Sequence, residues 1–296
     1  MPIKTKPAAE FSITEALVSR LLRAQHPDLT SLPLRFVASG WDSAVFRLGA
    51  QYAVRLPRRR MSARVVEHEI RWLPQIVGRL PLPIPVPLRV GVPSEEFPWS
   101  WTVVPWLPGS TAFATPPHDA AAAARTLGNF VAAMGSLAPA DAPTNGWRGV
   151  ALADRHTRVV DRIDHALPPE VRQQCHDLWN EGLAAPVWEG PPVWVHGDLH
   201  PANLIVDDGA ISAVIDFSDL TSGDPAGDLS VAWMMFGKDQ RTIFRNAAGG
   251  CDDATWVRAR TNALAHAAMC LGASSDDPVI AAIGQATLAS VLADTA

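Results

Sequence analysis

The stretch His196-Gly197-Asp198-Leu199-His200-Pro201-Ala202-Asn203, followed by Ile215-Asp216-Phe217, carries the strongest signal for the fold. It puts one acid and one amide five residues apart on a short polar loop, and a second acid thirteen residues after the amide. Transfer of a phosphoryl group needs a carboxylate that orients or deprotonates a hydroxyl, and oxygen ligands for Mg²⁺. The residue types and their spacing therefore indicate phosphoryl-transfer chemistry.

Two short β-branched runs explain how these residues would meet. The runs Leu204–Val206 and Ala213–Ile215 are expected to form a hairpin that turns at Asp207-Asp208-Gly209, a sequence typical of a tight turn. A hairpin of these two strands brings Asp216 back beside Asn203. The acidic turn is fully explained by the hairpin and needs no separate function.

An alternative interpretation of the same stretch is a hydrolase metal site. His196, Asp198 and His200 alternate, so on a strand they would face one way and could hold a metal ion. Pro201 after the trio, and the ordered partners Asn203 and Asp216, argue against this alternative.

Composition bounds the class of protein. The chain has 296 residues, of which 48% are hydrophobic and 19% charged, so it can form a sizeable core in two lobes or two modest domains. The net charge of −5 lacks the basic balance of a nucleic-acid-binding protein, and we interpret the run Arg58–Arg60 as a solvated loop. We expect no nucleic-acid partner, and the acceptor to be a small hydroxylated molecule.

The cysteines and the hydropathy predict a location. Three cysteines stand far apart, at Cys175, Cys251 and Cys270, without a CxxC pair. This pattern is typical of free thiols in a reducing compartment, so we expect a cytoplasmic protein. No apolar run reaches the 18 residues of a membrane span, and the first ten residues do not have the pattern of a signal peptide.

The first third of the chain predicts a small antiparallel sheet with helices. Ser12 and Glu15 have capping-box spacing and predict a helix to about Gln25. A second helix is expected from Ser62 to Gly78, kinked or ended early by Pro74. Short alternating runs predict four strands, at Leu34–Val37, Ala44–Leu48, Tyr52–Leu56 and Trp101–Val104, and the proline-rich stretch 80–93 can form only an edge strand or a connector.

The rest of the chain is expected to be mostly helical. Helices are predicted at about 117–137, 155–166, 168–183, 225–236, 238–247, 253–271 and 276–293, interrupted by the strands at 193–195, 204–206 and 213–215. The predicted fold class is therefore α+β, with a small antiparallel-sheet N-lobe and a larger, mostly helical C-lobe. We place the lobe boundary after residue 104, giving an N-terminal nucleotide-binding lobe at 1–104 and a catalytic and substrate-binding lobe at 105–296.

With these motifs in place, the chain resembles the aminoglycoside phosphotransferase family, which includes macrolide kinases and has a protein-kinase-like two-lobed fold. The resemblance covers roughly residues 35 to 240. It is carried by four segments: His196–Asn203 with Asp216, the run Gly223–Leu229, the loop Ser39–Val45 and the stretch Pro105–Gly109. In the family these correspond to the catalytic core with the segment that follows it, the nucleotide loop and the hinge.

The resemblance implies roles for individual residues. Asp198 would be the catalytic base or hydroxyl-orienting acid, His200 would contact the transferred phosphate, and Asn203 and Asp216 would hold Mg²⁺. Two further residues would brace the loop, His196 and Asp228.

The nucleotide would lie under the small lobe, with ATP or GTP as the donor. The resemblance implies contacts from Ser39, Gly40 and Ser43 of the nucleotide loop and from the hinge around Val104. The choice between ATP and GTP depends on backbone groups and side-chain bulk near residues 103–106, which the sequence leaves open.

One departure from the kinase pattern concerns the phosphate-binding lysine. The chain has only Lys4, Lys6 and Lys238, and none of them lies on the expected strand. Arg55 stands there instead, and its guanidinium can hold phosphate oxygens as a fork. Glu69 is the expected ion-pair partner, with Glu67 as the alternative. A solvent-exposed arginine on that strand is the competing interpretation, and the departure would also fit a weakened activity.

Three functions follow from this pattern. The first is a kinase for an aminoglycoside- or macrolide-type antibiotic. The second is a metabolic kinase for a sugar, choline-like or homoserine-like alcohol, and the third is a catalytically silent nucleotide-binding module. Retention of Asp198, Asn203 and Asp216 favours an enzyme. The sequence leaves the oligomeric state open.

The acceptor is expected against the helices that follow Asp216, where the side chains are mixed. Acids that could meet the ammonium groups of an aminoglycoside are Asp219, Asp224, Asp239, Asp252 and Asp253. Apolar side chains that could meet a macrolide ring are Trp233, Met234, Met235, Phe236 and Trp256. Most of the apolar set is expected in the core and several acids as helix caps, so neither set decides the substrate.

Overall fold

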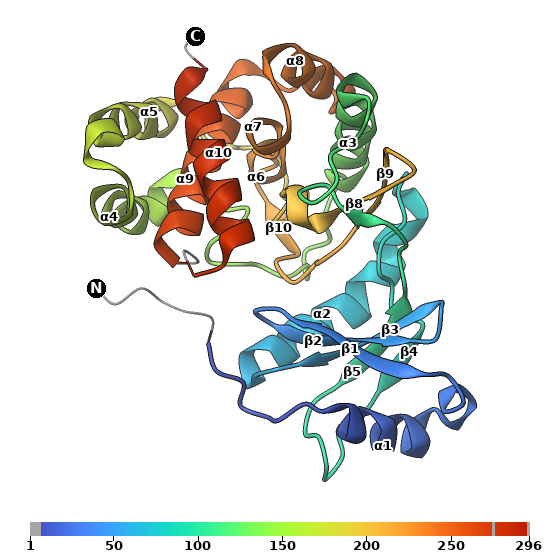
Figure 1. The fold of residues 1–296 in the computed structure, drawn as a ribbon. Helices are drawn as coiled ribbons and strands as arrows, with labels where there is room; N and C mark the ends of the chain where they lie inside the picture. Colours follow the sequence, from blue (N-terminus) through green and yellow to red (C-terminus); the bar gives the residue numbers. More distant parts are fainter. Residues whose placement is uncertain (1–6, 274–275, 295–296) are drawn as a thin grey trace.

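The computed structural model describes residues 7–273 and 276–294. A small lobe built around one antiparallel sheet lies against a larger lobe made mostly of helices (Figure 1). This arrangement confirms the predicted α+β fold with a sheet-containing N-lobe and a helical C-lobe. The boundary that we placed after residue 104 falls inside the last residues of a strand and stays a prediction.

The N-lobe sheet has five strands in the order β1-β2-β3-β5-β4, each antiparallel to its neighbour. Their bounds are Leu34–Ser39 for β1, Ser43–Leu48 for β2, Tyr52–Pro57 for β3, Arg89–Gly91 for β4 and Trp101–Pro105 for β5. The short strand β4, from the proline-rich stretch, lies at the sheet edge. Proline has no backbone N–H to give to a ladder, so an edge is where such a segment can pair.

Helices cover the two faces of this sheet differently. Helix α1 (Glu15–Gln25) packs its leucines on one face, where Phe46, Val54 and Leu56 are fully buried. Because successive side chains of a strand point to opposite faces, Arg55 lies on the other face, toward α2 (Arg60–Ile76). Figure 1 shows α1 and α2 on opposite sides of the sheet.

The start of α1 differs from the prediction, and the end of α2 agrees with it. The capping-box prediction was wrong, because Thr14 rather than Ser12 caps α1 and accepts the Leu17 N–H at 3.2 Å. The Glu15 carboxylate cannot reach back to a cap, since it accepts the Phe36 N–H of β1 at 2.7 Å. Pro74 lies in the last turn of α2, and the helix ends early, two residues later.

The C-lobe contains helices around two small antiparallel sheets. The α-helices are α3 (Ala120–Met134), α4 (His156–Ala166), α5 (Arg172–Ala184), α6 (Ala226–Leu229), α7 (Ala232–Met235), α8 (Lys238–Ala247), α9 (Asp253–Ala273) and α10 (Pro278–Ala293). The strands are β6 (Ser110–Thr111), β7 (Val193–Val195), β8 (Leu204–Asp207), β9 (Ala210–Val214) and β10 (Thr221–Gly223). β7 pairs with β10, while β8 lies between β6 and β9.

The helix predicted across 225–236 is wrong, because the chain breaks there into α6 and α7. The Ser230 hydroxyl donates to the Gly227 carbonyl at 2.6 Å, and the Val231 N–H bonds to Asp228 three residues back. A serine that bonds the backbone locally competes with the regular helical ladder. The break leaves Asp228 and the turn that follows it close to the loop at 196–203.

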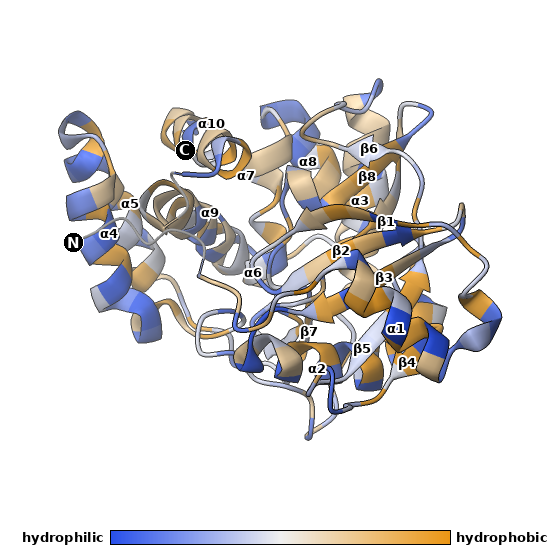
Figure 2. Ribbon diagram, turned by 60° about the horizontal axis from the view of Figure 1, so that its bottom comes forward, coloured by the Kyte–Doolittle hydropathy of each residue, from blue (hydrophilic) through white to orange (hydrophobic). Residues whose placement is uncertain are grey.

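The large core lies in the C-lobe but takes in the end of α2. Trp72, Leu73 and Ile76 belong to it, and the Trp72 ring packs edge-on against Trp194 of β7 at 5.2 Å between centroids. The two lobes are therefore joined by apolar packing as well as by the chain. In Figure 2 the strands β2 and β8 are largely hydrophobic, whereas the peripheral helices α4 and α5 carry broad hydrophilic stretches. Within the described residues, no helix has both the length and the apolar character of a membrane span.

The connection between α3 and α4 crosses β10 at very short range. The Pro143 carbonyl accepts the Ser222 N–H at 2.9 Å, and the Gly149 carbonyl accepts the Asp224 N–H at 2.9 Å. A methyl group on Gly223 would lie 1.8 Å from the Gly149 oxygen, so this approach requires a glycine. The segment 143–150 is in this way fixed against the strand that pairs with β7.

We predict that Gly223→Ala lowers the free energy of unfolding by about 1–3 kcal/mol, the usual effect of forcing extra volume into a packed site. The backbone of 143–150 must move to admit the methyl group. Chemical denaturation of the two proteins measures the difference. Gly78→Ala is the matched control, because a methyl group there meets no atom within 4 Å. Equal stability of Gly223→Ala and Gly78→Ala would contradict the prediction.

Candidate active site

The hairpin of β8 and β9 brings the predicted metal-binding residues together. The two strands are joined at Asp208 and Gly209, which have φ angles of 48° and 76°, the positive values that a tight type I′ turn requires. At the open end of the hairpin, the Ile215 N–H donates to the Asn203 carbonyl at 2.9 Å. Asp216 therefore follows directly on the residue bonded to Asn203, as the sequence predicted.

Backbone conformations that are unusual for their residue types occur at this site. Gly197 has φ of 88°, and a methyl group there would lie 2.5 Å from the Asp219 carbonyl oxygen. Asp216 has a φ of 62°, a left-handed backbone conformation. Residues other than glycine rarely adopt it, and it costs about 1–3 kcal/mol. Such strain persists only where the surroundings hold it, and it concentrates at functional sites.

Asp228 holds the start of the 196–203 loop. Its buried carboxylate accepts the backbone N–H of His196 at 2.7 Å and that of Gly197 at 2.9 Å. Burial raises the pKa of Asp228 to about 6, with the two N–H donors acting in the opposite direction. His196 braces the loop from inside, since its Nδ1 accepts the Asp198 N–H at 3.2 Å and its Nε2 lies 3.1 Å from the Ile215 carbonyl.

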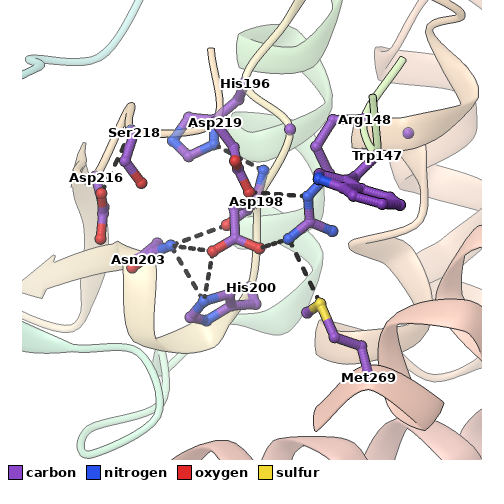
Figure 3. Close-up of polar contacts among 12 residues, drawn as sticks. Trp147, Arg148, His196, Asp198, His200, Asn203, Asp216, Ser218, Asp219 and Met269 are labelled. Carbon is purple, nitrogen blue, oxygen red and sulfur yellow. Dashed lines mark hydrogen bonds and ion pairs between the residues drawn. The ribbon is translucent and has the colours of Figure 1, made fainter. Parts of the chain in front are cut away.

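The Asp198 carboxylate is held from two sides (Figure 3). Its Oδ1 accepts from the Arg148 guanidinium at 2.6 Å, and its Oδ2 lies 3.4 Å from both His200 Nε2 and Asn203 Nδ2. Burial alone would raise the pKa of Asp198, but Arg148 and then His200 overcome this effect and hold it well below its ordinary range. Asp198 is therefore a permanently ionised hydrogen-bond acceptor, suited to orient a hydroxyl.

Sequence reasoning missed the residues that surround Asp198. Arg148 bridges Asp198 and Asp219, whose Oδ2 accepts from its Nε at 2.9 Å, and Asn145 donates to the other Asp219 oxygen at 3.0 Å. Arg148 stands fifty residues before Asp198 in a loop without strand or helix periodicity. His266 of α9 also packs against His200, and burial lowers its pKa to about 3, so it is neutral. No pattern in the sequence links these residues to Asp198.

His200 lies deeper than the role implied for it. Its side chain is buried, and its Nδ1 accepts the Ala202 N–H at 3.2 Å, which caps the short turn Pro201–Asn203. The ring thus supports Asp198 and Asn203 from behind. A contact between His200 and a transferred phosphate stays a prediction.

Asn203 and Asp216 have the donor chemistry of a magnesium site. The Asn203 amide nitrogen faces Asp198, donating to its carbonyl at 2.9 Å, so the amide oxygen turns to the side where Asp216 lies (Figure 3). Among the described residues, the Asp216 carboxylate accepts one hydrogen bond, a long contact of 3.4 Å from the Ser218 N–H. Within 7–273 and 276–294, no group of three His, Cys, Asp or Glu side chains could hold a metal. Two protein oxygens completed by phosphates and water do suit Mg²⁺.

The predicted ion pair across the N-lobe is present. Arg55 Nη1 donates to Glu69 Oε2 at 2.8 Å, and Glu69 is buried while the alternative partner Glu67 is exposed. Burial opposes the charge on Arg55, but Glu69 and then Asp216 raise its pKa. Arg55 is therefore not an exposed strand arginine, and its charge lies within electrostatic reach of the predicted metal ligand. A contact with nucleotide phosphates stays a prediction.

The nucleotide loop is a tight turn between β1 and β2. The Gly40 N–H donates to the Ser43 carbonyl at 2.9 Å, and Arg58 Nη1 donates to the Gly40 carbonyl at 2.9 Å. Ser43 is buried, Ser39 half-buried and Gly40 exposed. Arg58, interpreted from sequence as solvated, is buried and holds this turn. Gly40 has no positive φ, and a methyl group there would meet the Ser43 carbonyl oxygen at 3.6 Å, an ordinary contact, so the turn itself does not require glycine there.

The hinge leaves few free backbone donors. Val104 is buried and pairs with Ala53 of β3, Pro105 has no N–H, and the Trp106 N–H donates to the Gln51 carbonyl at 2.7 Å. A base stacked under the sheet would therefore meet donors from farther along the linker. Contact of Val104 with a nucleotide stays a prediction, as do those of Ser39, Gly40 and Ser43.

Comparison with known proteins identifies the fold and the family. The model of the phosphotransferase enzyme family matches residues 33–261, more than half of the chain. Sequence comparison with curated proteins finds no match.

Solved structures of the same fold share little sequence with the chain. A GDP complex of wild-type aminoglycoside 2'-phosphotransferase-IIIa is 18% identical with a TM-score of 0.72, over 95% of this chain and 99% of that one. The macrolide 2'-phosphotransferase MphH from Brachybacterium faecium is 23% identical with a TM-score of 0.62, over 94% and 98%. Aminoglycoside phosphotransferase APH(2'')-Ib with ADP is 18% identical with a TM-score of 0.61, over 94% and 99%. These likenesses confirm the kinase-like two-lobed fold.

We predict that Asp228→Asn lowers the free energy of unfolding by about 1–3 kcal/mol, because an amide offers one acceptor oxygen to two buried backbone donors. Turnover should fall as well, since the 196–203 loop loses its brace. Denaturation and steady-state kinetics measure the two effects. Asp207→Asn, an exposed carboxylate on β8, is the matched control. A variant that kept wild-type stability and turnover would remove Asp228 from this role.

Proposed function

This chain belongs to the phosphotransferase enzyme family and is a small-molecule kinase, and we propose that it transfers the γ-phosphoryl group of ATP or GTP, with Mg²⁺, to a hydroxyl of an antibiotic-type natural product. The first acceptors to test are an aminoglycoside and a macrolide, because proteins of these two activities share its fold. These proteins share 18–23% sequence identity with this chain, so an antibiotic acceptor is our proposal and is not shown by the likeness.

One observation carries the proposal: an ionised carboxylate, Asp198, stands beside an amide oxygen and a second carboxylate that are free to hold a cation. The hydrogen bond from Ile215 to Asn203 links the second acid to the amide. Asp198 would orient the acceptor hydroxyl and take up its proton late, since Arg148 keeps the carboxylate a weak base. A silent nucleotide-binding module has no chemical need for this third group.

For the donor, we propose that Arg55 holds phosphate oxygens and that Asn203 and Asp216 hold Mg²⁺. The buried Arg55–Glu69 pair supports the first part, since Glu69 fixes the guanidinium near Asp216. When bound, Mg²⁺ would neutralise charge on the phosphate oxygens. The GDP and ADP held by structures of this fold support a nucleotide donor.

For the acceptor, the structure weakens both sets of side chains considered from the sequence. Trp233 and Phe236 are buried in the core, away from any ligand. Asp219 is already paired with Arg148, and Asp224 is paired with Arg258 at 2.8 Å. The other three acids are exposed, but Asp253 pairs with Arg245 and Asp252 accepts the Thr255 N–H at 2.6 Å. Of the five, Asp239 is then the one carboxylate without a partner among the described residues, which leaves little to bind the ammonium groups of an aminoglycoside. This observation favours the second candidate, a kinase for a metabolic alcohol, as a serious alternative.

We predict that Asp198→Asn keeps nucleotide binding and lowers turnover by about 10²–10⁴-fold, the usual effect of losing a general base or its hydrogen bond to the reacting hydroxyl. An amide cannot accept the hydroxyl proton. Thermal shift with Mg-nucleotide tests binding, and phosphate release tests turnover. Near wild-type turnover by this variant would show that a group other than Asp198 orients or deprotonates the acceptor hydroxyl.

We predict that Arg55→Ala raises the nucleotide KM and that Arg55→Lys retains part of the activity, because an ammonium keeps the charge but not the fork. Arg55→Ala also leaves the buried Glu69 without a cation, which can destabilise the lobe by itself. The double variant Arg55→Gln with Glu69→Gln removes that complication. If the double variant binds nucleotide as tightly as the wild type, Arg55 is not a phosphate ligand.

The acceptor is tested by a phosphate-release screen of ATP and GTP against aminoglycosides, macrolides and metabolic alcohols. Turnover of an antibiotic with a micromolar KM would support the first candidate. Efficient turnover of a small metabolic alcohol, with no antibiotic phosphorylated, would replace the first candidate with the second.

A further inference from the structure

Four arginines form a continuous basic surface next to Asp198, which we call the arginine wall: Arg148, Arg155, Arg158 and Arg162. Arg155 ends the 3-10 turn Leu152–Arg155 that leads into α4, and Arg158 and Arg162 follow within α4 at spacings of three and four residues, which place the three on one helical face. Trp147 links them to Arg148: the Arg158 guanidinium lies 3.1 Å over its ring, and Arg155 Nη1 donates to its carbonyl at 3.1 Å.

The arginine wall has more positive charge than its surroundings neutralise. Among the residues that the structure describes, Arg148 pairs with two carboxylates, but Arg155, Arg158 and Arg162 have no carboxylate within 4 Å. Burial and then the neighbouring Arg148 lower the pKa of Arg155 to about 10. Burial also lowers the pKa of Arg162, followed by repulsion from Arg158 and Arg148. The four side chains thus repel one another.

The arginine wall also contains a donor without an acceptor. The Nε of Arg155 is fully buried and has no hydrogen-bond partner in the part of the chain that the structure describes, although its two terminal nitrogens bond to Trp147 and Asn262. A polar hollow of about 20 Å³ opens here, lined by Arg148, Arg155, Asn262 and His266 among others. A hollow of this size holds about one water molecule or one ligand oxygen. His266 is neutral, so it leaves the positive charge of the arginines around this hollow unbalanced.

We propose that the acceptor carries an anionic group, a carboxylate or a phosphate-like oxyanion, that binds the arginine wall while its hydroxyl meets Asp198. An oxyanion would supply the acceptor that Arg155 lacks and relieve the repulsion among the four arginines, and guanidinium groups match such oxygens as forks. Because Arg148 belongs to the wall and also contacts Asp198, the two ends of the acceptor are placed side by side. This inference rests on the proposed kinase activity and narrows its acceptor, against polycationic aminoglycosides.

The first test uses inorganic sulfate as the probe. The wild-type protein is saturated with Mg²⁺ and a non-hydrolysable nucleotide, so that the nucleotide phosphate site is filled, and its Tm is followed during a millimolar sulfate titration against sodium chloride of equal ionic strength. We expect a saturable rise in Tm. If neither an ATP nor a GTP analogue raises the Tm before sulfate is added, the kinase proposal fails, and this outcome is distinct from a failure of the anion site.

The variants Arg155→Gln and Arg162→Gln should lose the sulfate-dependent rise and keep the nucleotide-dependent one. For each variant, the Tm with sulfate is compared with the Tm of the same variant without sulfate. A lower stability of the variant itself therefore does not affect the comparison. Arg125→Gln, an exposed arginine on α3, is the matched control and should behave as the wild type. A linear, non-saturable response in the wild type, or an equal saturable response in all variants, would overturn the proposal.

The second test separates a free anion site from an acceptor site. Matched acceptors with the same open-chain skeleton, D-gluconate, D-glucitol and D-glucamine, are compared for phosphate release, as are larger hydroxy acids beside their amides. We expect the best acceptor to be acidic, and its kcat/KM to fall about tenfold or more in Arg162→Gln, the effect of losing one charge-assisted hydrogen bond. Preference for a neutral or amino acceptor, or an acid preference that survives in Arg162→Gln, would show that the wall does not bind the acceptor.

Discussion

The site depends on one buried carboxylate that accepts two backbone N–H groups. Asp228 ties the start of the 196–203 loop to α6, at 2.7 and 2.9 Å. Without it, two donors would be buried unpaired beside His196, at a cost that exceeds the net gain of an ordinary hydrogen bond. The positive φ of Gly197 and the support of Asp198 by His196 both follow from the position that Asp228 imposes.

The buried cations around this site are arginines rather than lysines, and this changes how their charges are stabilised. Arg55 keeps its charge when buried because Glu69 and Asp216 offset the loss of hydration. Arg148 does the same between Asp198 and Asp219, so the Asp198 carboxylate is ionised and fixed in direction. A lysine could not bridge two carboxylates with such a rigid fork. The excess positive charge of the arginine wall is what such a site needs if its acceptor is an acid.

The expectations that failed have local physical causes. Ser12 does not cap α1, because Thr14 is better placed and Glu15 is used by the backbone of β1. The helix across 225–236 is broken by a serine hydroxyl that bonds to a backbone carbonyl. At both places the sequence allows more than one set of local hydrogen bonds, and only the packed structure decides which set forms. Hydrophobic periodicity, by contrast, depends on burial alone, so it predicted the strands and the long helices.

The sequence by itself determined the α+β two-lobed fold and the hairpin that joins Asn203 to Asp216, and it offered Glu69 or Glu67 as the partner of Arg55, between which the structure decides for Glu69. These depend on residue types at short or regular spacing, where turn geometry and strand alternation leave little freedom. Only the tertiary structure decided what surrounds Asp198. Arg148, Asp219 and His266 come from segments far apart along the chain, and they meet because β10, the 143–150 segment and α9 pack together. Contacts set by the packing of distant segments have no period or spacing in the sequence from which they could be predicted.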